Sequence, residues 1–205
     1  MSWLMATVYD RFMRVSEEAC LARWRGELLR DLSGEVLEVG AGTGVTLAHY
    51  PKTLARLVLC EPDPHMRRKL ADKLAAALMK AELSDTAAEK LPFADASFDA
   101  VVSSLVLCSA RDQGAALAEI ARVLKRGGRL LFLEHVAADG KPERLKWQRR
   151  IEPVWKHLMG NCHLTRRTEA AIAAAGLRIE RIERESIRKA LPIVRPSIRG
   201  IARKS

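Results

Sequence analysis

The feature that most constrains the fold is a buried apolar run that leads directly into three closely spaced glycines. The segment VLEVGAGTG occupies residues 36–44, with Gly40, Gly42 and Gly44 at a G-x-G-x-G spacing. Glycine allows the backbone to approach a ligand closely, because any side chain would block that approach. The spacing differs from the G-x-G-x-x-G of dinucleotide enzymes, and no lysine follows as in a phosphate loop, which disfavours an NTP site. The segment predicts either a tight strand-to-helix turn or a ligand-binding loop.

An acidic residue after the next apolar run favours the ligand-binding alternative. Glu61 lies 21 residues after Gly40 and directly follows the run RLVLC at 56–60. A carboxylate at the end of a second strand can accept two hydrogen bonds from a ribose diol, as in nucleotide-binding folds. Together with Glu38 inside the first strand, the pattern predicts a ligand site rather than a bare turn.

Short apolar runs alternate with segments of helical periodicity along most of the chain. The pattern predicts strands at 35–39, 56–60, 98–104, 129–136 and 178–186, and helices at 44–50, 64–79, 111–124 and 165–175. One or two amphipathic helices are expected between residues 3 and 30. Strands that alternate with helices at this spacing imply a parallel sheet with right-handed crossovers, so we predict one α/β domain.

Charge is distributed unevenly along the chain. The 35 basic and 25 acidic residues leave a net charge of +10, but residues 1–140 hold 18 basic and 19 acidic residues, whereas residues 141–205 hold 17 and 6. Such an excess suggests an anionic partner, either nucleic acid or an anionic membrane surface. RNA binding would need aromatic stacking platforms among the basic residues, and only Trp147 and Trp155 are available there. Nucleic acid is therefore the less favoured partner.

The cysteines indicate neither a disulfide framework nor a metal site. Cys20, Cys60, Cys108 and Cys162 are far apart and form no C-x-x-C pair, so no metal ligand is predicted. Cys108 and Cys162 are expected to be small buried apolar residues. No apolar run reaches the roughly 18 residues of a spanning helix, and the N-terminal residues lack a signal-peptide pattern. We expect a cytoplasmic protein that can still contact a membrane peripherally.

Four segments resemble the class I S-adenosylmethionine (SAM) methyltransferases: VLEVGAGTG, LCEPDPHM, AAEKLPFADASFDAVVSS and EIARVLKRGGRLLFLEH. The resemblance implies a Rossmann-like fold with a mostly parallel central sheet, helices on both faces and SAM as the cofactor. It implies one domain over residues 1–205. Residues 1–30 would form an N-terminal helical lid, 31–136 the SAM-binding core, and 137–205 the acceptor-side cap with the final strands.

The same resemblance implies a set of cofactor-binding residues. The glycine loop would pack against the methionine and ribose portions of SAM, Glu61 would hold the ribose hydroxyls, and Pro62 and Met66 would flank the adenine. Relatives often place an aspartate near position 87, where this chain has alanine, so backbone amides or Glu89 are expected to contact the adenine amino group instead. The full expected set is Glu38, Gly40, Ala41, Gly42, Thr43, Gly44, Glu61, Pro62, Met66, Ala88, Glu89, Ser104 and Leu105.

Residues after the fourth predicted strand narrow the methyl acceptor. The segments SLVLCSA, EHV, WQ, PVWKH, NCHLTR and VRPSIRG resemble the animal microsomal alkyl-thiol S-methyltransferases, the methyltransferase-like seven group, and their bacterial relatives. The resemblance implies S-methylation of a small hydrophobic thiol. His135 is either a base that faces the acceptor or a structural partner of Glu134. Trp147, Trp155 and His157 either line the acceptor pocket or belong to an amphipathic helix that packs on the core.

Two other functions remain open at this point. Similar small SAM enzymes methylate the nitrogen of a phospholipid amine, or a carbon or oxygen of a quinone-like lipid, and the basic end of the chain would suit an anionic bilayer. A SAM- or RNA-binding module without turnover is the non-enzymatic alternative.

Overall fold

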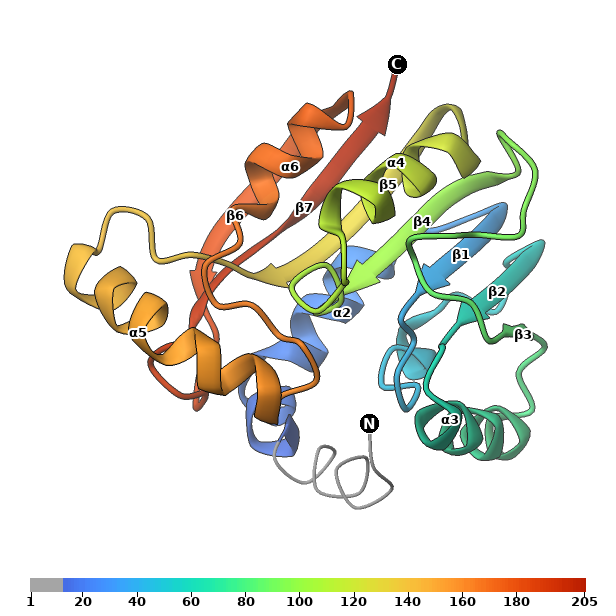
Figure 1. The fold of residues 1–205 in the computed structure, drawn as a ribbon. Helices are drawn as coiled ribbons and strands as arrows, with labels where there is room; N and C mark the ends of the chain where they lie inside the picture. Colours follow the sequence, from blue (N-terminus) through green and yellow to red (C-terminus); the bar gives the residue numbers. More distant parts are fainter. Residues whose placement is uncertain (1–12) are drawn as a thin grey trace.

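The computed structural model describes residues 13–205 and shows one twisted sheet flanked by helices (Figure 1). Within these residues, seven strands lie in the order β3-β2-β1-β4-β5-β7-β6. Strands β1 to β5 pair in parallel, whereas β7 runs antiparallel to both β5 and β6. The bounds are β1 Glu35–Val39, β2 Arg56–Cys60, β3 Glu82–Ser84, β4 Phe98–Ser104, β5 Leu124–His135, β6 Leu177–Ser186 and β7 Pro196–Lys204. The predicted α/β fold with a mostly parallel sheet is confirmed.

Helices cover both faces of this sheet (Figure 1). The turn-like π-helix η1 (Glu17–Leu21) continues into α2 (Ala22–Leu29), which shares one apolar cluster with α3 (Pro64–Ala77). On the opposite face, α4 (Gln113–Val123) and α6 (Thr168–Ala174) share the other cluster. Strand β5 contributes side chains to both clusters, because successive side chains of a strand point to opposite faces. Leu130 and Phe132 pack with α4, and Leu131 and Leu133 pack on the face of α2.

Side-chain caps determine where the two long helices on these faces begin. The Asp63 carboxylate accepts hydrogen bonds from the backbone N–H groups of His65 and Met66, and Pro64 opens the first turn of α3. Asp112 caps α4 in the same way by accepting from the N–H of Ala115. Such caps satisfy amides that would otherwise lack an intrahelical partner.

Residues 44–50 do not form the predicted helix. The chain passes through turns and one short 3₁₀ helix, η2 (Leu47–His49), before it becomes extended at Tyr50. Gly44 has φ +78°, which a right-handed helix does not allow. Pro51 pushes the preceding residue out of the helical region, so the segment has no length in which to form a helix.

Other boundaries also differ from the predicted ones. β5 begins at Leu124, five residues before the expected start, and its pairing with β4 shifts register after Phe98. The sequence pattern did not predict the short edge strand β3 or the strand β7, which lies antiparallel between β5 and β6. The predicted N-terminal helices are present from residue 13 onward, and residues 3–12 lie outside the described part of the chain.

The sheet order creates a topological switch point at the carboxyl ends of its central strands. β1 lies between β2 and β4, so the connections after β1 and β4 leave the sheet on opposite sides. Ligands of open α/β sheets bind at such a switch point, outside the carboxyl ends of the strands. Helix α5 (Pro142–Leu158) lies beyond the ends of β4 and β5 (Figure 1).

Candidate active site

The glycine loop after β1 is held by the acidic residue that follows β2. The backbone N–H of Gly42 donates to Glu61 Oε2 at 2.8 Å, and the N–H of Asp63 donates to Oε1 at 2.9 Å. The Glu61 side chain is largely enclosed, at 7% exposure, and burial raises the pKa of its carboxyl although the two amides act against the rise. The acid after β2 and the glycine loop after β1 thus lie together at one end of the sheet, and the ribose contact of Glu61 stays a prediction.

The loop glycines serve two different purposes. A Cβ on Gly40 would lie 2.6 Å from both Cγ atoms of Val106, so glycine is required there for packing. A Cβ on Gly42 would meet only the Met66 sulfur at 3.9 Å and the Gly40 carbonyl oxygen at 4.0 Å, so the backbone of Gly42 faces open space. Both residues have positive φ, which favours glycine. The open side of Gly42, between Glu61 and Met66, fits a cofactor that must approach the backbone.

Glu38 lies deeper than a ligand-facing carboxylate. Both of its oxygens lie 2.8 Å from the Thr46 hydroxyl, and the Tyr50 hydroxyl donates to Oε2 at 3.0 Å. Burial raises the pKa of the Glu38 carboxyl to about 7. Within the described residues, these contacts make Glu38 the support for the end of the glycine loop.

The other expected cofactor residues come from several segments near the carboxyl ends of the central strands. Ala41, Thr43, Met66 and Ala88 are buried, whereas Pro62 is exposed. Glu89 accepts hydrogen bonds from the backbone N–H of Arg111 at 2.6 Å and so supports the start of α4. Ser104 and Leu105 follow the pairing of β4 with β1, which places them beside the glycine loop.

A buried arginine that the sequence did not single out reaches the end of β4. Arg25 Nε on α2 donates to the Ser104 hydroxyl at 3.1 Å, and its Nη1 pairs with the carboxylate of Glu17. The guanidinium is almost fully enclosed. An arginine on an amphipathic helix is usually solvated, so only the packing of α2 against the sheet discloses this role.

Glu134, at the end of β5, organises the loop that follows β4. Its carboxylate accepts from the Ser103 hydroxyl at 2.8 Å and from the backbone N–H groups of Val106 and Leu107, both at 3.1 Å. A longer contact of 3.4 Å comes from the N–H of Cys108. The side chain is fully buried, and burial raises the pKa of its carboxyl. Its hydrogen bonds go to these donors, and its interaction with His135 is electrostatic: each residue favours the charged form of the other, which acts to lower the pKa of Glu134 and to raise that of His135.

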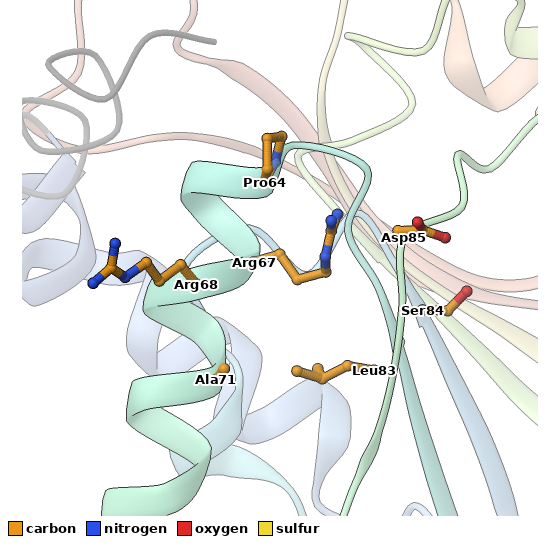
Figure 2. Close-up of a pocket in the computed structure, with 7 residues that line it drawn as sticks. All are labelled: Pro64, Arg67, Arg68, Ala71, Leu83, Ser84 and Asp85. Carbon is orange, nitrogen blue, oxygen red and sulfur yellow. The ribbon is translucent and has the colours of Figure 1, made fainter.

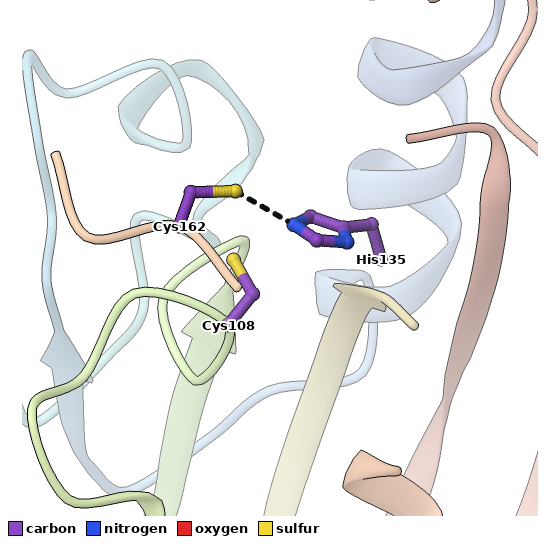
Figure 3. Close-up of side chains that lie close together, drawn as sticks. All are labelled: Cys108, His135 and Cys162. Carbon is purple, nitrogen blue, oxygen red and sulfur yellow. Dashed lines mark hydrogen bonds between the residues drawn. The ribbon is translucent and has the colours of Figure 1, made fainter. Parts of the chain in front are cut away.

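Three soft side chains meet beside this loop (Figure 3). Nε2 of His135 lies 2.9 Å from Sγ of Cys162, and the Trp155 indole N–H donates to the same sulfur at 3.3 Å. Cys108 projects its sulfur toward both, and the three potential ligand atoms all lie within 4.8 Å of one another. The sequence spacing predicts no metal site, because these residues come from segments that only the fold brings together.

The cluster has an unusual charge distribution for buried groups. Hydrogen bonding from the Cys108 thiol lowers the pKa of Cys162, and the bonds from His135 and Trp155 lower it further. The Cys108 pKa rises in turn. Burial by itself would lower the pKa of His135, but its interaction with Cys162 outweighs burial and raises it. Cys162 therefore takes part in polar contacts with His135 and Trp155, which differs from the expected pair of small apolar cysteines.

The three residues expected to line the acceptor pocket lie at separate places in the structure. Trp155 contacts the cluster through its indole N–H, whereas His157 is exposed. Trp147 is 55% exposed and lines an apolar groove of about 650 Å³ between the first half of α5 and residues 191–193, together with Ile151 and Leu191. Of the three, only Trp155 is in contact with His135 or Cys162.

A second groove lies at the edge of the sheet between α3 and β3 (Figure 2). Arg67 points across it toward β3, and its guanidinium also donates to the carbonyl oxygens of Glu61 and Pro62. None of the residues expected to bind the cofactor lines this groove. Among the helices of residues 13–205, none combines the length and the apolar character that a bilayer-spanning helix requires.

Comparisons with known proteins identify the family of this chain. Residues 37–132 match the family model described as a methyltransferase domain. Thiol S-methyltransferase TMT1B of Rattus norvegicus is 36% identical over 174 residues, which cover 81% of this chain and 70% of the relative. Demethylmenaquinone methyltransferase of Thermobifida fusca is 34% identical over 149 residues, 71% of this chain and 60% of the relative. The solved structure of geranyl diphosphate methyltransferase in complex with SAM superposes with a TM-score of 0.70 at 14% identity, over 92% of this chain and 86% of that one.

The sheet order, the glycine loop and the acid after β2 are those of a class I SAM-dependent methyltransferase, and the chain belongs to this family. SAM is its cofactor, as the sequence resemblance implied. Within the family, the chain is similar over most of its length to a thiol S-methyltransferase and over a shorter stretch to a quinone-modifying enzyme.

Proposed function

We propose that this enzyme transfers the methyl group of SAM to the sulfur of a small apolar thiol. The observation that carries the proposal is the buried cluster of Cys108, His135 and Cys162 beyond the carboxyl ends of β4 and β5. Cys108 lies three residues after Leu105 in the loop that follows β4, and we expect Ser104 and Leu105 to face the methionine portion of SAM. The similarity to a thiol S-methyltransferase supports the same acceptor class.

The chemistry asks little of the protein beyond alignment and deprotonation. The acceptor thiolate attacks the methyl carbon, the bond from that carbon to the cofactor sulfonium breaks, and its electron pair stays on the cofactor sulfur as S-adenosylhomocysteine. Holding the reactants in line can contribute roughly 7–11 kcal/mol to lowering the barrier. A free thiol with a pKa of about 8.5 is only a few per cent ionised near neutral pH, and the thiolate is the nucleophile. We assign to His135 the task of favouring the thiolate form.

Methyl transfer from isotopically labelled SAM tests the acceptor class. The panel contains an alkyl thiol, an aryl thiol and hydrogen sulfide, with a phenol, a demethylated quinol and phosphatidylethanolamine as competitors. We expect turnover on at least one thiol and a kcat/KM for it well above that for any competitor. Absence of turnover on every thiol, together with turnover on the quinol, the phenol or the amine lipid, would overturn the proposal.

We also propose that the outer face of α5 contacts an anionic membrane surface. Trp147, Ile151, Val154 and Leu158 follow one another at helical spacing and form an apolar stripe, of which Trp147, Val154 and Leu158 are largely exposed. Basic residues accompany this stripe on the same helix: Arg144, Lys146, Arg149, Arg150 and Lys156. An amphipathic helix of this kind lies in the interface, with its apolar residues among the lipid chains and its cations near anionic headgroups.

Co-sedimentation with lipid vesicles tests this contact. We expect the enzyme to sediment with vesicles that contain phosphatidylglycerol, more than with pure phosphatidylcholine, and less as salt is added. The double variant W147S/V154S should lose most of this binding. L78S is the matched control, because Leu78 is 92% exposed at the end of α3, away from α5. Equal sedimentation of W147S/V154S and wild type would refute the assignment of the surface to α5.

A further inference from the structure

We propose that Cys108, His135 and Cys162 form a three-ligand zinc site whose fourth position is open to the acceptor. The metal site itself follows from the arrangement of these side chains, and the role of its open position rests on the thiol methylation proposed above.

The three ligand atoms have nearly the spacing that a zinc ion requires. Zinc binds thiolate sulfur at about 2.3 Å and imidazole nitrogen at about 2.0–2.1 Å, so the corners of a tetrahedral site lie roughly 3.5–3.8 Å apart. Nε2 of His135 and Sγ of Cys162 are 2.9 Å apart, and no pair among the three atoms exceeds 4.8 Å. The observed range brackets the required spacing, so side-chain shifts of less than about 1 Å would complete the ligand set.

The chemical nature of the three donors also favours zinc. Two thiolates and one imidazole are soft and borderline ligands that favour zinc over calcium or magnesium, which require oxygen. The carboxylate closest in sequence, Glu134, is occupied by the loop amides and the Ser103 hydroxyl. Two cysteines and one histidine are the ligand set of a zinc site whose fourth position takes water or substrate, whereas structural sites supply four protein ligands.

Surrounding contacts hold the two cysteine ligands in place, whereas Nδ1 of His135 has no hydrogen-bond partner within the described residues. Asn161 Nδ2 donates to the carbonyl oxygens of Ser109 and Ala110, at 3.0 and 3.3 Å, and thereby ties the Cys162 segment to the Cys108 loop. Arg166 donates to the Ala110 carbonyl oxygen at 2.5 Å and joins the same two segments. The Trp155 N–H on the Cys162 sulfur is the kind of outer contact that orients a metal ligand.

A zinc ion here would solve the problem of the acceptor proton. When a thiol enters the fourth position it binds as the thiolate, its proton passes to solvent, and the sulfur keeps a lone pair for the methyl carbon. Attack forms the new carbon–sulfur bond as the cofactor sulfonium takes the electron pair of the bond that breaks. The thioether product is a weaker ligand than the thiolate, which favours its release.

Metal analysis of the full chain tests the site. Protein purified after growth with added zinc should contain roughly one zinc ion per chain, and the variants C108S, C162S and H135A should lose at least about nine-tenths of it. C20S is the matched control, because Cys20 is a buried cysteine on η1 outside the cluster, and it should keep the metal. Because a ligand variant can unfold, each is also checked by its thermal unfolding transition and by its affinity for SAM. Full retention of zinc by a folded C162S variant, or a zinc content near zero in wild type incubated with excess Zn²⁺, would overturn the site.

Substitution by Co²⁺ tests the open position. The cobalt form should show thiolate-to-cobalt absorption in the near ultraviolet and the intense visible bands of tetrahedral cobalt, and an alkyl thiol should shift those bands without removing the metal. Chelation should lower kcat/KM for the thiol at least roughly 100-fold, with recovery on addition of Zn²⁺. Unchanged thiol methylation after complete metal removal would refute the metal role and leave the proposed function intact. A shifted cobalt spectrum without methylation of any thiol would support the site and refute the proposed function.

Discussion

Two glutamates at the ends of neighbouring strands hold loops by the same means but leave different capacity for a ligand. Glu61, after β2, accepts one backbone amide on each oxygen, whereas Glu134, at the end of β5, accepts a hydroxyl and three amides. A carboxylate has about four acceptor positions. Glu61 therefore keeps roughly half of its capacity for the cofactor, while Glu134 is filled by the protein itself.

The comparison separates the two halves of the active site. In the cofactor half, the backbone of the glycine loop lies beside a partly available acid, so we expect the main chain to do most of the recognition. In the acceptor half, the acid holds the loop after β4, and the groups proposed to act on the acceptor are Cys108, His135 and Cys162. Four predictions test this division, in order of decreasing effect.

Replacement of Glu134 should cost the most stability. E134M keeps the length of the side chain but removes both acceptor oxygens, which leaves the Ser103 hydroxyl and the buried N–H groups of the loop without acceptors. We expect a loss of about 4 kcal/mol in the free energy of unfolding, measured by urea denaturation. A loss below about 1 kcal/mol would show that Glu134 is not the main support of this loop.

The buried carboxyl of Glu38 should make stability depend on pH. Its pKa is raised to about 7 by burial, from 4.5 in the unfolded chain, so the folded state binds the proton more tightly. The free energy of unfolding from this group therefore falls as pH rises from about 4.5 to about 7, and it stays constant above that range, a total of about 3 kcal/mol. The difference between E38Q and wild type, measured without SAM at several pH values, should change by this amount in favour of E38Q. A constant difference would contradict the assigned shift.

Replacement of Glu61 should affect the cofactor more than the fold. E61A removes the acceptor of the Gly42 amide and the carboxylate available to the ribose. We expect a loss in SAM affinity of about 100-fold, which corresponds to about 2.7 kcal/mol, in isothermal titration calorimetry. The zinc content proposed for the acceptor half should stay as in wild type, because the two glutamates serve different loops. A SAM affinity within about threefold of wild type would refute the role of Glu61 in cofactor binding.

A pair of glycine variants probes the contact that joins the two halves. Gly40 and Gly127 both have positive φ, but a Cβ meets Val106 at 2.6 Å in the first and nothing within 4 Å in the second. G127A should cost about 1 kcal/mol for the dihedral alone, and G40A about 1–2 kcal/mol more because Val106 must move. Equal losses in thermal or urea unfolding would mean that Val106 yields without cost.

Local patterns along the chain predicted much of the fold. β1, β2 and β4 have the predicted bounds, because each is a short and mostly apolar run, and α3 and α4 follow Asp63 and Asp112 caps. β3 has three residues and lies at an edge, so its sequence carries little signal. The failed helix at 44–50 shows the opposite case, in which apolar spacing competes with glycine φ values and with Pro51, and the backbone restrictions prevail.

The site divides in the same way. Gly42 and Glu61 could be paired from their spacing, since the ends of adjacent parallel strands meet at one edge of a sheet. Nothing in the local sequence pairs Cys108, His135 and Cys162, or aims Arg25 at Ser104, because contacts of this kind span 27 to 79 residues of chain. The class of fold, the cofactor and the glycine loop expected to bind it could be read from the chain alone, because they depend on backbone conformation over a few residues. The three-dimensional packing was needed to show that Glu61 keeps acceptor capacity, that Glu134 is filled, and where the sulfur and imidazole groups meet, because these contacts join side chains from distant segments.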